Sequence, residues 1–177
     1  MSTQDSTLVV SAHAADFVWR AGGAIALAAA RGHRVTVLCL TYGERGESAS
    51  AWRAGKTLEE IKALRRAEAE NAAAALGAQI EFLDAGDYPL RETDELVHRI
   101  VEVYRQVSPS VVLTHPVADP YNYDHPAAAQ MALRARVLAQ AVGPGAPSAA
   151  TQTPPAYQLG RASHVMSSMY PSQLAWT

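Results

Sequence analysis

Four short apolar runs alternate with four segments of helical character along most of this 177-residue chain. The runs lie at residues 7–13, 34–40, 79–86 and 110–115, and their apolar and β-branched residues are typical of buried strands. Strands that alternate with helices predict a parallel sheet with right-handed crossovers. We therefore expect an α/β protein with a Rossmann-like three-layer α/β/α fold and a mostly parallel sheet, truncated at its C-terminus.

The segment from Thr57 to Ala78 has the clearest helical signals. Thr57 and Glu60 have the spacing of a capping box, in which each side chain bonds the other residue's backbone N–H. Gly77 stands where a helix commonly ends, because glycine tolerates the left-handed backbone of that position. Helices are also predicted at residues 19–33 and 93–109, and a loop followed by a helix at residues 119–143.

The character of the sequence changes after Gly143. Residues 144–156 are rich in proline, alanine and small polar residues, as in a linker, and residues 157–177 have neither a helical nor a strand period. We therefore expect one catalytic α/β core over residues 1–143, and a linker with an atypical tail over residues 144–177. A shifted reading frame or a truncation is our hypothesis for the origin of that tail.

The charge pattern argues against two classes of partner. The formal net charge is −2 and no basic run is present, so we expect neither nucleic acid nor an anionic membrane surface as a partner. No apolar stretch has the length of a membrane span, and the first residues, MSTQDS, are polar, unlike a signal peptide. Cys39 is the single cysteine, so no intrachain disulfide is possible, which suits a cytoplasmic protein.

Polar residues follow each predicted strand. His13 and Asp16 follow the first strand, the GERGES loop at residues 43–48 follows the second, and the segment from His115 to His125 follows the fourth. The string DAGDYPLR stands at the end of the third. The carboxyl ends of parallel strands meet at one edge of the sheet, where α/β proteins bind their ligands. We therefore expect these polar residues to converge.

His13, Asp16 and His125 together offer two imidazoles and one carboxylate. Three protein ligands of these types with one open position have the composition of a catalytic zinc site. The residues alone leave a second interpretation equally open. In that interpretation His13 and Asp16 only cap the helix that follows, with Asp16 as its N-cap.

Three motifs resemble those of the LmbE/PIG-L-type zinc deacetylase superfamily. SAHAADFVWRAGG resembles the first motif, A-H-P-D-D-E; RRAEAENAAAALGA resembles an R-x-x-E helix that ends in L-G; and NYDHPAA resembles a later D-H motif. The resemblance extends from Thr7 to Gly143. It implies that a zinc ion is held by His13, Asp16 and His125.

The chain departs from the deacetylase pattern beside this expected metal site. Ala15 stands where the deacetylases have the aspartate that activates water as a general base, and Ala14 and Phe17 replace their proline and glutamate. Positioned proton transfer contributes roughly 10²–10⁴-fold to a rate, so the loss of that base would severely impair amide hydrolysis. Either the base lies elsewhere or the chain is not a deacetylase.

Four strings narrow the resemblance to one branch of the superfamily. HAADFVWRAGG, GERGES, GDYPLR and DPYNYDHP are similar to the 4-oxalomesaconate hydratases of gallate and protocatechuate degradation, which lack the deacetylase base. The resemblance implies a hydro-lyase that adds water to the C=C bond of 4-oxalomesaconate and forms 4-carboxy-4-hydroxy-2-oxoadipate. The expected partner is this small tricarboxylate, and the full-length protein is expected to be a homo-oligomer.

Glu47 is our first candidate for the base that hydration needs, and Glu44 is the second. Both belong to the GERGES loop at the functional edge of the sheet, and catalytic groups concentrate on such loops. The alternative is that both glutamates are merely solvated in a polar loop.

The carboxylates of the implied substrate favour arginine, which binds a carboxylate through two parallel hydrogen bonds. The candidates for substrate binding are Arg20, Arg45, Arg65 and Arg91. Arg65 either clamps the substrate, oriented by Glu68, or only forms an ion pair with Glu68 one turn along the helix.

Three residues directly before His125 complete the candidate site. Asn122 and Tyr123 are candidates for hydrogen bonds to the substrate. Asp124 is expected to fix the imidazole tautomer through a hydrogen bond, or else to cap the helix. His115 either acts as an acid or is an ordinary polar residue at a strand end.

Three other interpretations stay open. The first is a zinc-dependent N-acyl deacetylase of the same superfamily that uses another base. The second is a Rossmann-type nucleotide-binding protein, but RAGGAIA lacks the G-x-G-x-x-G pattern and no acidic residue ends the second strand. The third is an inactive truncated fragment, in which metal binding survives without turnover because all three expected ligands precede Gly143.

Overall fold

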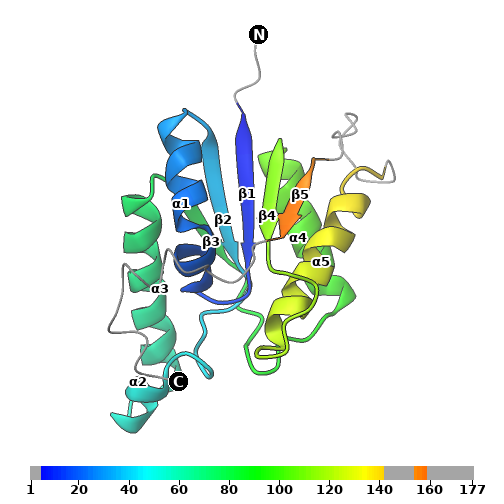
Figure 1. The fold of residues 1–177 in the computed structure, drawn as a ribbon. Helices are drawn as coiled ribbons and strands as arrows, with labels where there is room; N and C mark the ends of the chain where they lie inside the picture. Colours follow the sequence, from blue (N-terminus) through cyan, green and yellow to red (C-terminus); the bar gives the residue numbers. More distant parts are fainter. Residues whose placement is uncertain (1–4, 142–153, 159–177) are drawn as a thin grey trace.

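The computed structural model describes residues 5–141 and 154–158, which form a five-stranded sheet flanked by helices (Figure 1). The strand order is β3-β2-β1-β4-β5, and every neighbouring pair is parallel. In chain order the elements are β1 (Ser6–Ser11), α1 (Asp16–Ala30), β2 (Arg34–Cys39), α2 (Ala49–Arg53), α3 (Leu58–Ala75), β3 (Gln79–Phe82), α4 (Asp94–Val107), β4 (Val111–Thr114), α5 (Asp124–Leu138) and β5 (Ala156–Gln158).

Helices cover both faces of the sheet and complete three layers. α1 and α3 contribute Ile25 and Ala69 to the core on one face, and α4 and α5 contribute Ile100 and Met131 to the core on the other. Both faces of the central strands are therefore buried. This explains why these strands are continuous apolar runs rather than alternating ones.

The chain changes direction across the sheet between β3 and β4. The first three strands step toward one edge, and α4 then returns the chain to β4, which pairs with the free side of β1. The segments after β1 and β4 lead to helices on opposite faces, α1 and α5. Open α/β sheets bind ligands at such a switch point, beyond the carboxyl ends of the two strands.

The predicted α/β/α fold with a mostly parallel sheet is confirmed. The capping box of α3 is also present, because the Glu60 N–H donates to Thr57 Oγ1 (3.3 Å) and the Thr57 N–H donates to Glu60 Oε2 (2.7 Å). Gly77 follows this helix with a φ of 74°, in the left-handed region that glycine tolerates.

Several elements differ from the sequence prediction. α1 begins at Asp16 rather than Trp19, and the third strand ends at Phe82 rather than Gly86. α2 and β5 were not predicted, because elements of five and three residues are too short to show a period. β5 lies in the segment described above as linker and tail, where the Val112 N–H donates to Pro155 O (3.0 Å) and ties that segment to β4.

Most of the segment 144–177 lies outside the described residues. The hypothesis of a shifted reading frame or a truncation concerns that segment, and the structure therefore does not test it. Across residues 5–141 and 154–158, no helix is both long enough and apolar enough to cross a lipid bilayer.

Candidate metal centre

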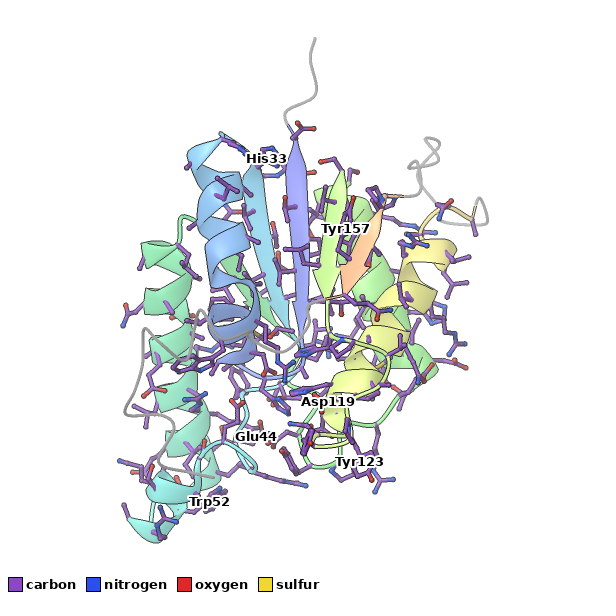
Figure 2. The ribbon with its side chains drawn as sticks, in the orientation of Figure 1. His33, Glu44, Trp52, Asp119, Tyr123 and Tyr157 are labelled. Atoms are coloured by element: carbon purple, nitrogen blue, oxygen red, sulfur yellow. The ribbon has the colours of Figure 1, made fainter. Side chains whose placement is uncertain are left out.

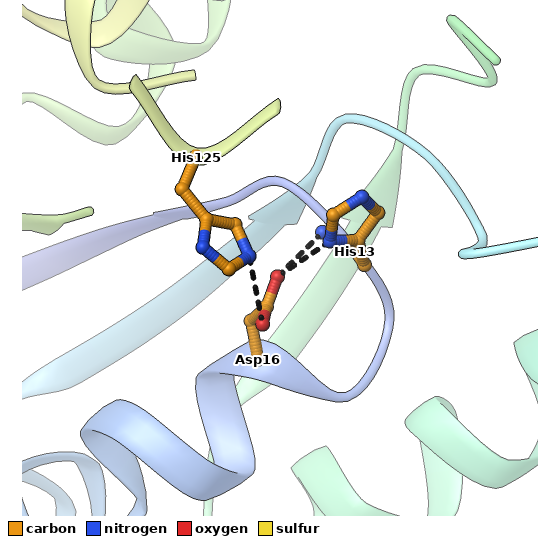
Figure 3. Close-up of side chains that lie close together, drawn as sticks. All are labelled: His13, Asp16 and His125. Atoms are coloured by element: carbon orange, nitrogen blue, oxygen red, sulfur yellow. Dashed lines mark hydrogen bonds and ion pairs between the residues drawn. The ribbon is translucent and has the colours of Figure 1, made fainter. Parts of the chain in front are cut away.

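His13, Asp16 and His125 meet at the carboxyl end of β1 (Figure 3). His13 lies in the turn after β1, Asp16 is the first residue of α1, and His125 is the second residue of α5. One ligand-type atom from each of the three residues lies within 4.8 Å of the other two, and all three side chains are buried. The fold therefore brings together the two imidazoles and the carboxylate that the sequence singled out.

The Asp16 carboxylate lies between the two imidazoles. Its Oδ2 accepts a hydrogen bond from the His13 backbone N–H (3.0 Å) and lies 2.9 Å from His13 Nδ1. Its Oδ1 lies 3.4 Å from His125 Nε2. Ala15, not Asp16, occupies the N-cap position of α1, so the alternative in which Asp16 is an ordinary helix cap is wrong.

Each imidazole also has a second carboxylate on its outer side. Asp124 Oδ2 lies 3.1 Å from His13 Nε2, and Asp119 Oδ2 lies 2.8 Å from His125 Nδ1. Metal-binding histidines usually have such an outer partner, which fixes the tautomer and leaves the other nitrogen for the metal. Sequence reasoning placed Asp124 beside His125 and missed Asp119, because spacing alone does not reveal which carboxylate meets which ring.

Two groups compete for His125 Nδ1: Asp119 Oδ2, which only accepts, lies at 2.8 Å, and Arg20 Nη2, which only donates, lies at 3.2 Å. The shorter contact with Asp119 favours a proton on Nδ1. The Nε2 atom of His125 is then an acceptor that faces Asp16. This atom is buried and has no hydrogen-bond partner among the residues that the structure describes. A buried nitrogen without a partner is costly unless a ligand completes it, and a metal ion fits that position.

The electrostatics of the centre favour a bound cation. Burial opposes a charge on His13, but its hydrogen bonds to Asp124 and Asp16 outweigh burial and raise the pKa of His13 to about 10. Burial likewise opposes the charge on Asp16, yet His125 and His13, when protonated, hold the pKa of Asp16 far below its ordinary value. Positive charge is thus stabilised between these side chains.

The two candidate bases have different surroundings. Glu47 Oε1 lies 3.9 Å from His13 Nδ1, and Glu47 Oε2 lies 3.1 Å from Arg65 Nη2. Burial and the neighbouring Asp16 carboxylate raise the pKa of Glu47. Glu44 is buried, whereas the Glu47 side chain is 26% exposed, and Glu44 Oε2 accepts a hydrogen bond from the Tyr42 N–H (3.1 Å) within its own loop (Figure 2). Glu47 is therefore the glutamate that contacts the cluster.

Arg65 links Glu47 to helix α3. Its Nη1 donates to Glu68 Oε2 (2.7 Å), so the ion pair predicted from the R-x-x-E motif is present. Its Nε donates to the Tyr42 carbonyl oxygen (3.3 Å), which ties the same guanidinium to the loop after β2. Glu68 and the Tyr42 carbonyl thus hold in place the guanidinium that contacts Glu47.

Asp87 fixes the backbone of the GERGES loop, and sequence reasoning gave it no role. Its buried carboxylate accepts hydrogen bonds from the backbone N–H groups of Arg45 (2.9 Å) and Gly46 (2.7 Å). Gly46 lies directly against the ring of Tyr88, which a Cβ atom at position 46 would overlap. The loop that carries Glu47 is therefore clamped by the segment after β3.

Arg20 is the candidate arginine nearest to the cluster. Its Nη2 lies 3.4 Å from Asp119 Oδ2, and its Nε lies 3.8 Å from Asp16 Oδ1. Its Nη1 is buried and finds no hydrogen-bond partner within the described ranges. The side chains of Arg45 and Arg91 are exposed.

The three residues before His125 differ in how far their side chains are buried. Asp124 is buried and also accepts hydrogen bonds from the Tyr88 N–H (2.9 Å) and the Leu90 N–H (2.9 Å). Asn122 donates to the Tyr88 hydroxyl (3.0 Å), and Tyr123 is 84% exposed at the edge of the molecule (Figure 2). His115 is buried beside the cluster, and burial lowers the pKa of His115 to about 3, so the interpretation of His115 as an acid loses support.

The family model described as PIG-L, GlcNAc-PI de-N-acetylase, matches residues 8–136. The chain belongs to the PIG-L family. This family is metal-dependent, which agrees with the His-Asp-His cluster.

Two curated relatives are named for two different activities. The chain is 54% identical over 155 residues to a 4-oxalmesaconate hydratase from Pseudomonas putida, with 87% of this chain and 60% of that protein covered. It is 36% identical to a 1D-myo-inositol 2-acetamido-2-deoxy-alpha-D-glucopyranoside deacetylase from Rhodococcus erythropolis, with 67% of this chain and 47% of that protein covered. The chain thus spans less than two thirds of either relative.

Two solved structures that resemble this chain are likewise named for a hydratase and a deacetylase. The structure of GalB, the 4-carboxy-2-hydroxymuconate hydratase from Pseudomonas putida KT2440, matches with a TM-score of 0.85 and 52% identity over 88% of this chain and 65% of that chain. An N,N'-diacetylchitobiose deacetylase from Pyrococcus horikoshii matches with a TM-score of 0.69 and 27% identity over 77% of this chain and 51% of that chain.

Proposed function

We propose that this chain carries the catalytic core of a metal-dependent hydratase, a hydro-lyase that adds water to the C=C bond of 4-oxalomesaconate. The product would be 4-carboxy-4-hydroxy-2-oxoadipate. One observation carries the proposal: the His13, Asp16 and His125 cluster lies beside Ala15, and the GERGES loop brings the Glu47 carboxylate to within 3.9 Å of His13 Nδ1. The hydratase relative at 54% identity supports the same activity.

We propose zinc as the metal and His13, Asp16 and His125 as its ligands. Two imidazoles, one carboxylate and an open position suit a catalytic zinc ion, and the outer carboxylates Asp119 and Asp124 leave His125 Nε2 and His13 Nδ1 facing inward. When bound, zinc would supply Lewis acidity that polarises oxygen atoms in the site.

Glu47 would act as the general base. Its carboxylate lies next to the metal ligands, and the burial that raises its pKa also strengthens its pull on a proton. Arg65 would keep the carboxylate in place through the 3.1 Å contact with Glu47 Oε2, and we propose this positioning role for Arg65 rather than a contact with substrate.

The reaction itself needs little more than a base and a polarised substrate. The alkene is conjugated to a ketone, so the carbon β to the ketone is electrophilic. Glu47 would take one proton from the attacking water while the new C–O bond forms at that carbon. A proton then returns to the carbon α to the ketone, and the net change is the addition of one water molecule.

Recognition of the tricarboxylate would come from the edge of the site. Arg20, whose guanidinium lies beside Asp119 and Asp16, is the candidate arginine nearest to the cluster and would bind one substrate carboxylate. Arg45, Asn122 and Tyr123 lie at or near the exposed edge and would contact the remaining polar groups of the substrate.

Amide hydrolysis is the competing function, because the family model and the Rhodococcus relative are named for deacetylases. A substrate comparison separates the two. Zinc-loaded protein is incubated with 4-oxalomesaconate and, in parallel, with an N-acetylglucosaminyl substrate, and products are identified by mass spectrometry. We expect a mass increase of one water on 4-oxalomesaconate and no released acetate. Release of acetate without hydration would contradict the proposal.

A further inference from the structure

His115 connects the two segments that carry the histidine ligands. It directly follows β4, and its side chain is almost completely buried. On one side it touches the backbone of Ala12, the residue before His13, and on the other it touches the ring of His125. No step of the proposed hydration uses it.

The hydrogen bond to Ala12 occupies one ring nitrogen of His115. The Ala12 N–H donates to His115 Nε2 over 2.9 Å, so Nε2 carries no proton and its lone pair is used. The proton of the neutral imidazole is then on Nδ1, which is buried and has no hydrogen-bond partner among the residues that the structure describes. With one lone pair in a hydrogen bond and the other nitrogen protonated, His115 has no lone pair to offer to a metal ion.

The ring of His115 lies flat against His125. The two ring centroids are 4.3 Å apart and the ring planes differ by 6°. His125 is therefore held on its face by His115 and at its Nδ1 edge by Asp119, at 2.8 Å. A ring restrained in both ways keeps Nε2 directed toward Asp16.

We infer that His115 is a positioning residue that sets the geometry of both histidine ligands without binding the metal. Its hydrogen bond fixes the strand end from which His13 projects, and its ring fixes the plane of His125. This inference rests on the proposed metal site. It assigns to His115 the kind of support that an outer residue gives to a metal ligand.

Two substitutions separate the two contacts. His115→Phe keeps a flat ring against His125 but has no acceptor for the Ala12 N–H. His115→Gln keeps an acceptor oxygen but removes the ring. His98→Gln is the control, because His98 is exposed on α4. Zinc affinity is measured by competition with a chromophoric chelator, folding by circular dichroism, and the number of coordinated imidazoles by X-ray absorption of the zinc-loaded proteins.

We expect each His115 variant to fold and to bind zinc roughly 10- to 100-fold more weakly than the wild type, as for other residues that orient metal ligands. The number of coordinated imidazoles stays the same, and His98→Gln binds zinc like the wild type. Affinities within tenfold of the wild type in both His115 variants would overturn the inference. Loss of one coordinated imidazole would also overturn it, because His115 would then be a ligand.

Two further outcomes can be distinguished from a loss of zinc affinity in the variants. If neither His115 variant folds, the residue serves the fold rather than the metal, and the inference is overturned. If the wild-type protein binds no zinc, the proposed metal site itself fails, and this is seen before any variant is compared.

Discussion

Glu47 Oε1 lies 3.9 Å from His13 Nδ1, while the second oxygen of the same carboxylate lies 3.1 Å from Arg65 Nη2. This relationship places a carboxylate whose side chain is only 26% exposed beside the candidate metal ligands, in a chain that has Ala15 where the resemblance to the deacetylases implies their base. It also distinguishes two glutamates that are only three residues apart in the sequence.

Replacement of Glu47 by Gln should lower kcat by roughly 10²–10⁴-fold, the usual contribution of a positioned base. The amide keeps the shape of the side chain, so zinc affinity should change much less than kcat. The measurement is steady-state hydration of 4-oxalomesaconate with zinc content determined in parallel. Glu44→Gln is the matched variant in the same loop, and it should keep most of the activity because its amide oxygen still accepts from the Tyr42 N–H. The reverse order of effects would transfer the role to Glu44.

Replacement of Asp119 by Asn should weaken zinc binding roughly 10- to 100-fold, because an outer carboxylate keeps the proton on the far nitrogen of its histidine. Asp119 Oδ2 lies 2.8 Å from His125 Nδ1. Chelator competition gives the affinity, and Asp94→Asn on the exposed start of α4 is the control. An unchanged affinity in Asp119→Asn would mean that this contact does not support a ligand.

Replacement of Gly46 by Ala should destabilise the protein by about 1 kcal/mol, the low end of the cost of overpacking, since the added methyl group displaces the half-exposed Tyr88 ring. The measurement is the free energy of unfolding in urea. In a Tyr88→Ala background the same substitution should cost much less, because the ring that it meets is gone. If Gly46→Ala lowered the free energy of unfolding equally in both backgrounds, a contact other than the Tyr88 ring would be responsible for the loss.

Replacement of Thr57 by Ala should reduce the free energy of unfolding by about 1 kcal/mol, the typical cost of losing an N-cap side chain. The Thr57 hydroxyl accepts from the Glu60 N–H, and this pair begins the helix that carries Arg65. Urea denaturation measures the change, and Lys56→Ala next to the cap serves as the control. A loss no larger than that of the control would contradict this account of the helix start.

Much of the fold was predictable because its signals are local or topological. Apolar runs separated by helical segments indicated a parallel sheet, and parallel strands bring their carboxyl ends together. This is why His13 and His125, which are far apart in the sequence, were expected at one place. β5 escaped prediction because three residues after Pro155 show no period, and its place depends on pairing with β4.

The finer arrangement of the site depends on contacts that no spacing rule contains. Asp124 is adjacent to His125 in the sequence, yet its side chain turns to His13, while Asp119 reaches His125 from the loop before α5. Glu44 and Glu47 share one loop, and the backbone hydrogen bonds to Asp87 help determine which of them faces the cluster. Which carboxylate meets which histidine, and which glutamate faces the cluster, depend on how the loops after β2, β3 and β4 pack against one another.

The most direct test of the central claim is the disappearance of the conjugated-enone absorbance of 4-oxalomesaconate with purified, zinc-loaded protein. We predict that the absorbance falls, that a chelator stops the fall, and that added zinc restores it. Glu47→Gln protein with the same zinc content should leave the absorbance nearly constant. A steady absorbance in the presence of wild-type protein that holds stoichiometric zinc would contradict the proposed hydratase activity.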